Sequence, residues 1–357
     1  MPLLNVQNVK REIAKALLSP LLRWRPLKNP APGFSLVLPA PWALRHILGV
    51  NLRFVQRANL DGLHRFHVVF DRTKQAGADE FIEKVRARFP DLPLEFQFQP
   101  RLAGSIVRLV NRSHFYANLS WTVGLGACAS RYAILHHFDL YLTDPDLFVK
   151  IIRSMGKRRL HFSGMEYRMD DEWWDVIKPP MVGGNEMGID LAWLRENARP
   201  LDCWHKVVII NGTRCNLDGF NYVQLRTPAR ALAEGVGSES AVHVWNLVSS
   251  YLKYTSGQRF NIAWRLHFLW YLESLSGQDH RLQTVTKAMQ AAQTPVLAID
   301  GRPVDFSTEH VTCSNVLRDR VSRMEETLFG QCRPEVATYL HEFQGFLSRF
   351  GRTGEIH

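Results

Sequence analysis

Hydrophobic and polar positions alternate between two patterns along the first hundred residues. Short runs rich in β-branched and aromatic residues predict buried strands, whereas apolar positions three and four residues apart predict helices. The predicted strands are 34–41, 64–71 and 94–99, and the predicted helices between them are 42–60 and 79–89. Strands that alternate with helices indicate a mostly parallel sheet flanked by helices, which is an α/β fold.

The pattern beyond residue 100 is less regular. It predicts a helix within 104–129 and a strand within 131–148 that runs into a polar turn. We expect the next helix to begin at Pro145, with Asp144 as its N-cap. From 156 to 260 the chain is rich in Gly, Trp and Asp, which is typical of loops that contact a substrate.

The chain becomes helical again after residue 262, either as a small helical subdomain or as an extension that packs on the sheet. We therefore predict three parts. These are an N-terminal basic amphipathic helix within 1–30, an α/β domain over 31–255 and a helical C-terminal extension over 256–357.

The first part of the chain has an apolar row at helical spacing with basic residues around it. The row consists of Val6, Val9, Ile13, Leu17 and Leu21, and the basic residues are Lys10, Arg11, Lys15, Arg23, Arg25 and Lys28. Such a helix can lie on an anionic membrane surface. It can also pack on the domain with its apolar row toward the core, and we favour this second interpretation because most such rows face a core.

The amino-acid composition and net charge limit the classes of protein to which the chain can belong. With 46% hydrophobic and 22% charged residues, the 357-residue chain is expected to fold rather than to be disordered. A formal net charge of +10 suits nucleotide phosphates, anionic lipid or nucleic acid. No zinc spacing, helix-turn-helix or aromatic RNA-binding motif is present, so we expect no specific nucleic-acid partner.

The five cysteines are widely spaced and include no CxxC pair. An odd number in a chain of this length indicates reduced thiols in a cytosolic setting. No apolar run reaches about 18 residues, and charges interrupt the N-terminal apolar stretch, so we expect neither a transmembrane helix nor a signal peptide. The expected location is the cytoplasm, with a peripheral place at the inner face of the membrane as the alternative.

Ligands of parallel sheets bind beyond the carboxyl ends of the strands. Pro39, Asp71 and Asp139 fall at such ends in the predicted sheet.

Five segments carry a resemblance to a known family. SLVLPAPWALRHILGVNLRFV (35–55) and HVVFD (67–71) resemble the first two strands of family 2 type glycosyltransferases, and ANLSWTVGLGACASRYAILHHFDLYLTDPD (117–146) resembles the stretch that holds their DxD motif. LDGFNY (217–222) resembles the segment that reads GFDE in many members, and VHVWNLV (242–248) resembles a late segment with histidine. The resemblance covers roughly 34–250.

This resemblance implies a GT-A-like, Rossmann-like fold and transfer of a sugar from a nucleotide-sugar donor to a glycan or a lipid-linked saccharide. It implies that Pro39, Asp71, His137 and Asp139 bind the nucleotide sugar, with His137-Phe138-Asp139 in the place of DxD. The chain departs from the family at His137 and at Asn221, where the family has acids. A catalytically inactive GT-A-like binding or scaffolding protein is therefore the alternative function.

A metal site is predicted at the same place. His137 and Asp139 are two residues apart on a strand, so their side chains point to the same side, and His243 would complete the set. Mn²⁺ accepts nitrogen ligands, whereas Mg²⁺ prefers oxygen, so the cofactor is expected to be Mn²⁺ or Mg²⁺. In the alternative interpretation His136 and His137 are interior histidines and Asp139 is a turn residue.

An inverting transfer needs a general base, and the candidates are Glu186, Asp190 and Asp218. The acidic run 170–172 before Trp173 and Trp174 is either an acceptor subsite, since tryptophans stack on sugar rings, or a solvated acidic run. The basic stretch 156–162 either grips the diphosphate or is a solvated loop, and we favour the loop.

Overall fold

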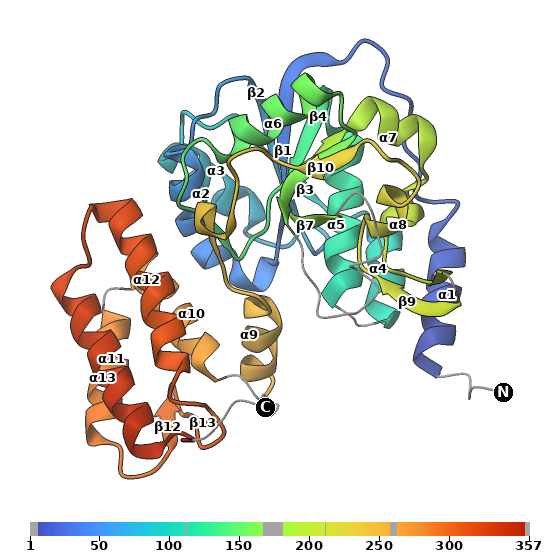
Figure 1. Ribbon diagram of the computed structural model, residues 1–357. Coiled ribbons are helices and arrows are strands. Elements are labelled where there is room, and N and C mark those ends of the chain that lie inside the picture. The colour runs from blue at the N-terminus through green and yellow to red at the C-terminus, as the bar shows by residue number, and fades with distance from the viewer. Residues whose placement is uncertain are drawn as a thin grey trace. The chain divides into compact units, whose positions relative to one another are not determined.

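The computed structural model describes residues 6–110, 113–166, 181–210, 212–257, 263–278 and 280–353. The chain forms two compact units, each built from several stretches (Figure 1). The first unit contains Met1–Ala43, Gln56–Phe138 and Asp144–Ser240. The second contains Leu44–Val55, Asp139–Thr143 and Ala241–His357.

The first unit is an α/β structure. Its helices are α1 (Val6–Leu18), α3 (Ala78–Arg88), α4 (Arg101–Val110), α5 (Ser113–Ala127), α6 (Leu147–Arg158), α7 (Leu191–Asn197) and α8 (Asn221–Gln224). Its main strands are β1 (Ala31–Ala40), β2 (Leu63–Phe70), β3 (Leu94–Phe98), β4 (Ser130–Leu135), β6 (Phe162–Glu166), β7 (Val182–Asp190) and β10 (Arg230–Leu232). A separate hairpin consists of β8 (Lys206–Ile210) and β9 (Thr213–Leu217).

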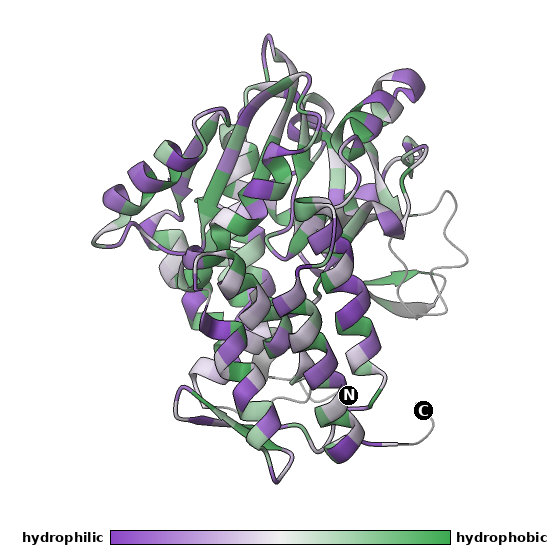
Figure 2. Ribbon diagram, turned by 90° about the vertical axis from the view of Figure 1, so that its left-hand side faces the viewer, coloured by the Kyte–Doolittle hydropathy of each residue, from purple (hydrophilic) through white to green (hydrophobic). Residues whose placement is uncertain are grey.

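The seven main strands form one sheet in the order β10-β6-β7-β4-β1-β2-β3. Strands β1, β2, β3 and β4 pair in parallel, and β6 and β10 pair in parallel, whereas β7 pairs antiparallel with both β4 and β6. The predicted α/β fold, a mostly parallel sheet flanked by helices and followed by helices, is therefore confirmed. Figure 2 shows that hydrophobic residues dominate the strands of this sheet, as expected where helices cover both faces.

The central strand β1 shows why these residues form a buried strand. Residues 34–38 are buried without interruption, so neither face of β1 reaches solvent. Helix α5 packs closely over β1 and β2 because it carries glycine at position 124. A Cβ atom on Gly124 would lie 2.4 Å from the Cγ1 atom of Val37.

The second unit is mainly helical. Its helices are α2 (Leu48–Gln56), α9 (Leu247–Thr255), α10 (Trp264–Leu275), α11 (His280–Ala291), α12 (Cys313–Phe329) and α13 (Pro334–Phe350). Two short antiparallel pairs accompany them, β5 (Leu140–Leu142) with β11 (Ala241–His243), and β12 (Val296–Ile299) with β13 (Arg302–Asp305). Helix α10 forms the centre of this unit, since almost all its side chains are buried.

Three details differ from the sequence predictions. Helix α6 begins at Leu147 rather than at Pro145, and Asp144 instead accepts a hydrogen bond from the backbone N–H of Asp146, the N-cap residue. The stretch 156–260, expected to be irregular, supplies three strands of the main sheet. The pattern also missed the β12–β13 hairpin, whose strands have only four residues each.

The N-terminal helix α1 packs on α4 with a face that the sequence interpretation did not select. The residues that it buries are Ala14 and Leu18, followed by Leu22 just after the helix. The row that we expected to face the core includes Val9, Ile13, Leu17 and Leu21, and these four side chains are exposed. The favoured interpretation was therefore right that α1 packs on the domain and wrong about the row that faces the core.

Among the described residues, no helix is both long enough and apolar enough to cross a membrane.

Candidate functional site

The carboxyl ends of β1, β2 and β4 lie at one edge of the sheet, because these strands are parallel. Pro39 is half-buried at the penultimate position of β1, and Asp71 follows β2 directly. The backbone N–H of Asp71 donates to the carbonyl of Ala40 at 3.1 Å, which fixes Asp71 beside the end of β1. His136 follows β4, and its N–H donates to the carbonyl of Val37.

The carboxylate of Asp71 is held in place by its neighbours and is partly buried. Its Oδ1 accepts a hydrogen bond of 2.9 Å from the backbone N–H of Trp42, whose ring packs edge-on against Phe70. Burial raises the pKa of Asp71 above its ordinary value, although the bond from Trp42 and the charge of Arg72 act in the opposite direction. The carboxylate is thus an anion in a partly desolvated place, where a ligand's hydrogen-bond donor would stabilise it.

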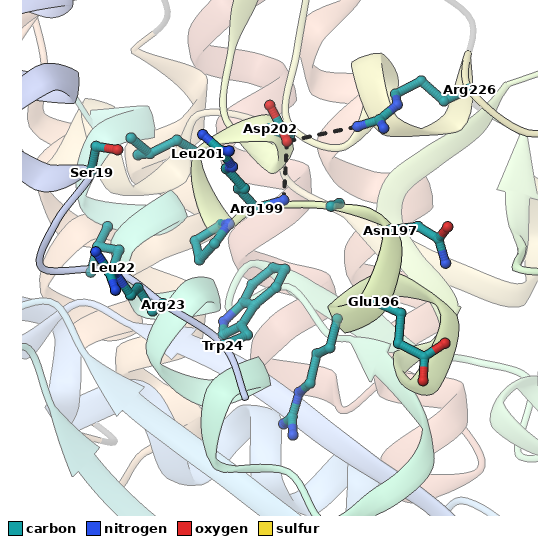
Figure 3. Close-up of a pocket in the computed structure, with 13 residues that line it drawn as sticks. Ser19, Leu22, Arg23, Trp24, Glu196, Asn197, Arg199, Leu201, Asp202 and Arg226 are labelled. Atoms are coloured by element: carbon teal, nitrogen blue, oxygen red, sulfur yellow. Dashed lines mark hydrogen bonds and ion pairs between the residues drawn. The ribbon is translucent and has the colours of Figure 1, made fainter. Parts of the chain in front are cut away.

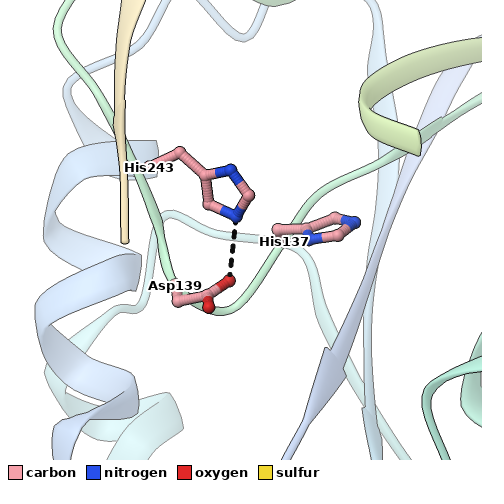
Figure 4. Close-up of side chains that lie close together, drawn as sticks. All are labelled: His137, Asp139 and His243. Carbon is pink, nitrogen blue, oxygen red and sulfur yellow. Dashed lines mark ion pairs between the residues drawn. The ribbon is translucent and has the colours of Figure 1, made fainter. Parts of the chain in front are cut away.

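The structure brings His137, Asp139 and His243 together (Figure 4). Each offers one ligand atom, and these atoms all lie within 4.8 Å of one another. The Nε2 atom of His243 is 3.4 Å from Oδ1 of Asp139. His137 stands one residue away from Phe138 and two from Asp139, so the chain itself keeps it close to the pair.

Antiparallel pairing between β5 and β11 holds Asp139 and His243 in place. In this pairing His243 lies opposite Leu140, and the N–H of Val244 donates to the carbonyl of Asp139 at 2.9 Å. The next side chain, Trp245, is 53% exposed and its ring lies edge-on 5.6 Å from that of His243. An exposed tryptophan beside the group gives a flat apolar surface on which a sugar or a base can stack.

Arg265, on helix α10, is a charged neighbour of Asp139 that the sequence did not indicate. Burial lowers the pKa of its guanidinium, the nearby charge of Arg320 lowers it further, and the carboxylates of Glu309 and Asp139 raise it. The group around Asp139 therefore combines one carboxylate, two imidazoles and a nearby arginine. A cation next to a single carboxylate weakens attraction for a metal ion and strengthens attraction for phosphate.

Glu186, a candidate base, is fully buried at the same edge of the sheet. Its Oε1 atom is paired with Nδ1 of the buried His136, because Met187 lies opposite Leu135 in the β4–β7 pairing. Its backbone has a φ of +52°, which is unusual for a residue other than glycine. The structure thus places Glu186 as the interior partner of a histidine.

Asp190, the second candidate, lies at the other edge of the sheet. It faces Tyr132 near the start of β4, whereas Asp71 and His137 follow the ends of parallel strands. Its side chain caps helix α7 by accepting a bond from the N–H of Trp193 and lies 3.2 Å from Arg131.

Asp218, the third candidate, is exposed just before helix α8. Phe220, two residues later, packs against Trp121, and Trp121 packs against His137 with ring centroids 5.2 Å apart. The segment that resembles GFDE thus lies near His137. Asn221, at the acid position, is buried, and its amide nitrogen has no hydrogen-bond partner among the described residues.

The acidic run 170–172 and Trp173 and Trp174 lie outside the described residues. The basic stretch 156–162 lies toward the same edge as Asp190, because the N–H of Asp190 donates to the carbonyl of His161. These cations are therefore at the edge opposite to Asp71.

A cavity of about 710 Å³ also lies toward that opposite edge (Figure 3). Arg195 in its wall donates to the carbonyls of Leu125 and Cys128, immediately before β4. The arginines that line the cavity are Arg23, Arg195, Arg199 and Arg226. The cavity therefore lies at the edge of the sheet opposite to Asp71.

Comparison with known proteins gives structural neighbours only. No protein-family model and no curated protein matches the chain. The similar solved structures include glycosyltransferases of the kind that the sequence resembles. One is the mannosyltransferase PcManGT from Pyrobaculum calidifontis, in complex with GDP-Man and Mn²⁺, with 12% identity, a TM-score of 0.33 and 52% of each chain covered.

Two other neighbours are matched over more of their length. S. aureus TarS 1–349 in complex with UDP has 10% identity and a TM-score of 0.38, with 89% of this chain and 91% of that chain covered. Glucosyl-3-phosphoglycerate synthase from Mycobacterium tuberculosis, in complex with Mn²⁺ and UDP, has 13% identity and a TM-score of 0.34, with 74% and 84% covered. The chain spans about half the length of the mannosyltransferase. Similarity of this degree concerns the fold and carries no information about individual residues.

Proposed function

We propose that the chain transfers a sugar from a nucleotide-sugar donor and binds the donor's diphosphate at His137, Asp139 and His243. One observation carries the proposal. Three side chains able to bind a metal have ligand atoms within 4.8 Å of one another, and the segment that carries His137 and Asp139 directly follows the carboxyl end of a parallel strand. That end of an α/β sheet is the usual place of a nucleotide ligand.

The residues present suit a divalent cation. One carboxylate oxygen and two imidazole nitrogens form a mixed donor set, which Mn²⁺ accepts more readily than Mg²⁺ does. We therefore propose Mn²⁺ as the ion and Mg²⁺ as a weaker substitute. When bound, such an ion would neutralise the charge of the departing nucleoside diphosphate.

Other side chains have roles in the proposal that follow from their places. Asp71 accepts hydrogen bonds from the ribose or the base, and Pro39 lines the nucleotide at the end of β1. Arg265 attracts the diphosphate, because its guanidinium already lies within the electrostatic reach of Asp139. Trp245 offers its exposed ring to the transferred sugar or to the acceptor.

Asp218 is the general base that we propose. A base must reach the hydroxyl of the acceptor, and Asp218 has an exposed carboxylate on a segment that packs toward His137 through Trp121. Glu186 is fully buried against His136, and Asp190 caps a helix at the other edge of the sheet. The proposed acceptor is a glycan or a lipid-linked saccharide.

The test is release of nucleoside diphosphate from a panel of uridine and guanosine diphosphate sugars, with Mn²⁺ and with EDTA. We expect one donor to be turned over in Mn²⁺ and EDTA to abolish the reaction. Asp139→Asn should abolish it too, whereas Asp91→Asn, which changes an exposed aspartate near the start of β3, should not. Full activity in EDTA would contradict the metal site and leave Arg265 as the first phosphate ligand to test.

A second function, donor binding without transfer, has one observation in its favour. The buried Asn221 stands where the resembling family has an acid, and an amide cannot act as a base. A thermal-shift screen distinguishes the two functions, since a ligand that binds the folded state raises its stability. Stabilisation by one nucleotide sugar, with no release of diphosphate for any acceptor, would favour the binding function.

A further inference from the structure

An apolar row on helix α1 is exposed. The side chains along it are Val9, Ile13 and Leu17, followed by Leu21 just after the helix, and they are 39–56% exposed. Val9, Ile13 and Leu17 recur every four residues and so lie along one side of the helix. This row is not required to attach α1 to the first unit, because the helix packs on α4 with its other apolar face.

Two neighbouring elements of the same unit also have exposed apolar side chains. Leu102 and Leu109 on α4 are 61% and 74% exposed, and Val207 and Ile209 on β8 are 46% and 76% exposed. Helix α1 packs against α4, and it shares a cavity of about 510 Å³ with β8, which is lined in part by residues of both. Figure 1 shows α1, α4 and β9 at the same end of the first unit.

Basic residues outnumber acidic ones on the stretches of chain that carry α1 and α4. Residues 6–28 and 101–110 contain eight basic side chains and one acidic side chain, Glu12. The basic ones are Lys10, Arg11, Lys15, Arg23, Arg25, Lys28, Arg101 and Arg108. Glu12 lies 2.8 Å from Lys15, so its charge is already matched. The cavity of Figure 3 is lined by four arginines, including Arg199, and by two acids, Glu196 and Asp202.

We propose that this surface, called here the α1–α4–β8 face, docks on an anionic lipid bilayer. The face consists of the eight exposed apolar side chains named above and the basic residues around them. Exposed apolar side chains can enter the boundary between headgroups and acyl chains, while lysine and arginine meet the lipid phosphates. The positive charge favours an anionic bilayer over a second copy of the chain as the partner of this face. A second copy would place like charges opposite one another, which is unfavourable.

The proposal does not depend on sugar transfer and is tested by sedimentation with vesicles. We expect the protein to bind vesicles of phosphatidylcholine with phosphatidylglycerol at least tenfold more strongly than vesicles of phosphatidylcholine alone, and to be released by salt. Ile13→Gln and Ile209→Gln should each lower the partition coefficient about tenfold, the effect of no longer burying one large apolar side chain. The matched control is Leu252→Gln, since Leu252 on α9 is 42% exposed but lies outside the face, and it should bind as the wild type does.

The charge contribution has its own test. Lys10→Gln combined with Arg108→Gln should lower binding to the anionic vesicles about tenfold or more and leave binding to the neutral ones unchanged. Because all these side chains are on the surface, the melting temperature should stay at the wild-type value. Three results would overturn the proposal. They are no binding to anionic vesicles, equal losses for Ile13→Gln and Leu252→Gln, and self-association that Ile13→Gln abolishes without any vesicle binding.

Discussion

Replacement of Asp71 separates a ligand-binding role from a structural one. Asp71→Asn keeps an oxygen that can accept the hydrogen bond from Trp42 N–H, and it removes the negative charge. Because burial is the largest influence on this carboxylate, the charged form is less stable in the folded protein than in the unfolded chain. The asparagine variant should therefore be at least as stable as the wild type at neutral pH, yet it should bind nucleotide less tightly.

The expected losses of stability and of nucleotide affinity follow from the contacts of Asp71. Asp71→Ala leaves the Trp42 N–H without its acceptor at 2.9 Å, and Asp71 is only half-buried, so we expect a loss of about 1 kcal/mol, the low end for an unpaired buried donor. A hydrogen bond from ribose or base to a carboxylate contributes about 1.5–3 kcal/mol. Loss of that bond in the alanine variant corresponds to nucleotide binding that is about 10-fold to 150-fold weaker.

The stability effect of Asp71 depends on pH in a definite direction. Its pKa is higher in the folded protein than in the unfolded chain, so the folded protein holds this proton more tightly. The corresponding stability is fully present below the unfolded pKa of about 4 and is lost as the pH rises through the folded pKa. Asparagine does not titrate, so the advantage of Asp71→Asn over the wild type should grow from about pH 4 to neutral pH.

Urea unfolding measures the stabilities, and calorimetry with uridine and guanosine diphosphates measures the affinities. Asp91→Asn is the matched control, because it removes the same charge from an exposed position of the same unit. If Asp71→Asn destabilises the protein and leaves nucleotide affinity unchanged, Asp71 serves only to hold Trp42, and its place in the nucleotide site is refuted.

Three further predictions concern the candidate metal site and the packing of the sheet. Asp139→Asn should abolish the thermal stabilisation by Mn²⁺ with nucleotide and lower turnover at least 100-fold, which corresponds to about 3 kcal/mol. His137→Asp should raise Mg²⁺-dependent turnover, measured against Mn²⁺ in the same assay, because it adds an oxygen ligand. Gly124→Ala should destabilise by about 1–3 kcal/mol in urea unfolding, since its Cβ would lie 2.4 Å from a methyl group of Val37. Gly126→Ala is its control, because the nearest atom would be 3.4 Å away, and equal effects would contradict this packing argument.

Three of the sheet strands that the sequence predicts have continuous apolar runs. β1, β2 and β4 are buried in this way, so their sequences alone identify them. β7 was missed because its sequence, VGGNEMGID, has no such run. Gly188 shows the reason, since a Cβ there would lie 2.6 Å from the side chains of Ile151 and Met155. Helix α6 fills the space that side chains of an ordinary strand would take.

Helix α1 shows a second limit of pattern reading. Its sequence has one apolar row through Ile13 and Leu17 and another through Ala14 and Leu18, and both have helical spacing. Hydrophobicity alone does not say which row meets the domain. The choice depends on the shape of α4, against which the smaller side chain of Ala14 can pack closely.

The residues of the candidate site show the same difference between local and long-range information. The two-residue spacing of His137 and Asp139 is local, so the sequence could place them together. His243 joins them only because β11 pairs with β5 across about a hundred residues, and family resemblance rather than spacing suggested it. Arg265 carried no signal beyond being a cation in an apolar helix, and only tertiary packing brings it near Asp139.

Arg265 affects how the site binds a metal ion when position 137 is a histidine rather than an acid. The nearby guanidinium of Arg265 offsets the charge of Asp139, the one carboxylate of the group, so the group attracts a free divalent cation weakly. The diphosphate of a donor would supply the missing negative charge, and Arg265 would share in holding it.

Metal and nucleotide should then bind together far more tightly than either alone, and by linkage each should raise the affinity of the other by the same factor. Calorimetric titration of Mn²⁺ with and without nucleotide measures this factor. Arg265→Gln should raise the affinity for Mn²⁺ alone while it lowers the affinity for nucleotide, a pair of opposite changes that loss of folding would not produce. Mn²⁺ binding that is equally tight with and without nucleotide would refute this account of the site.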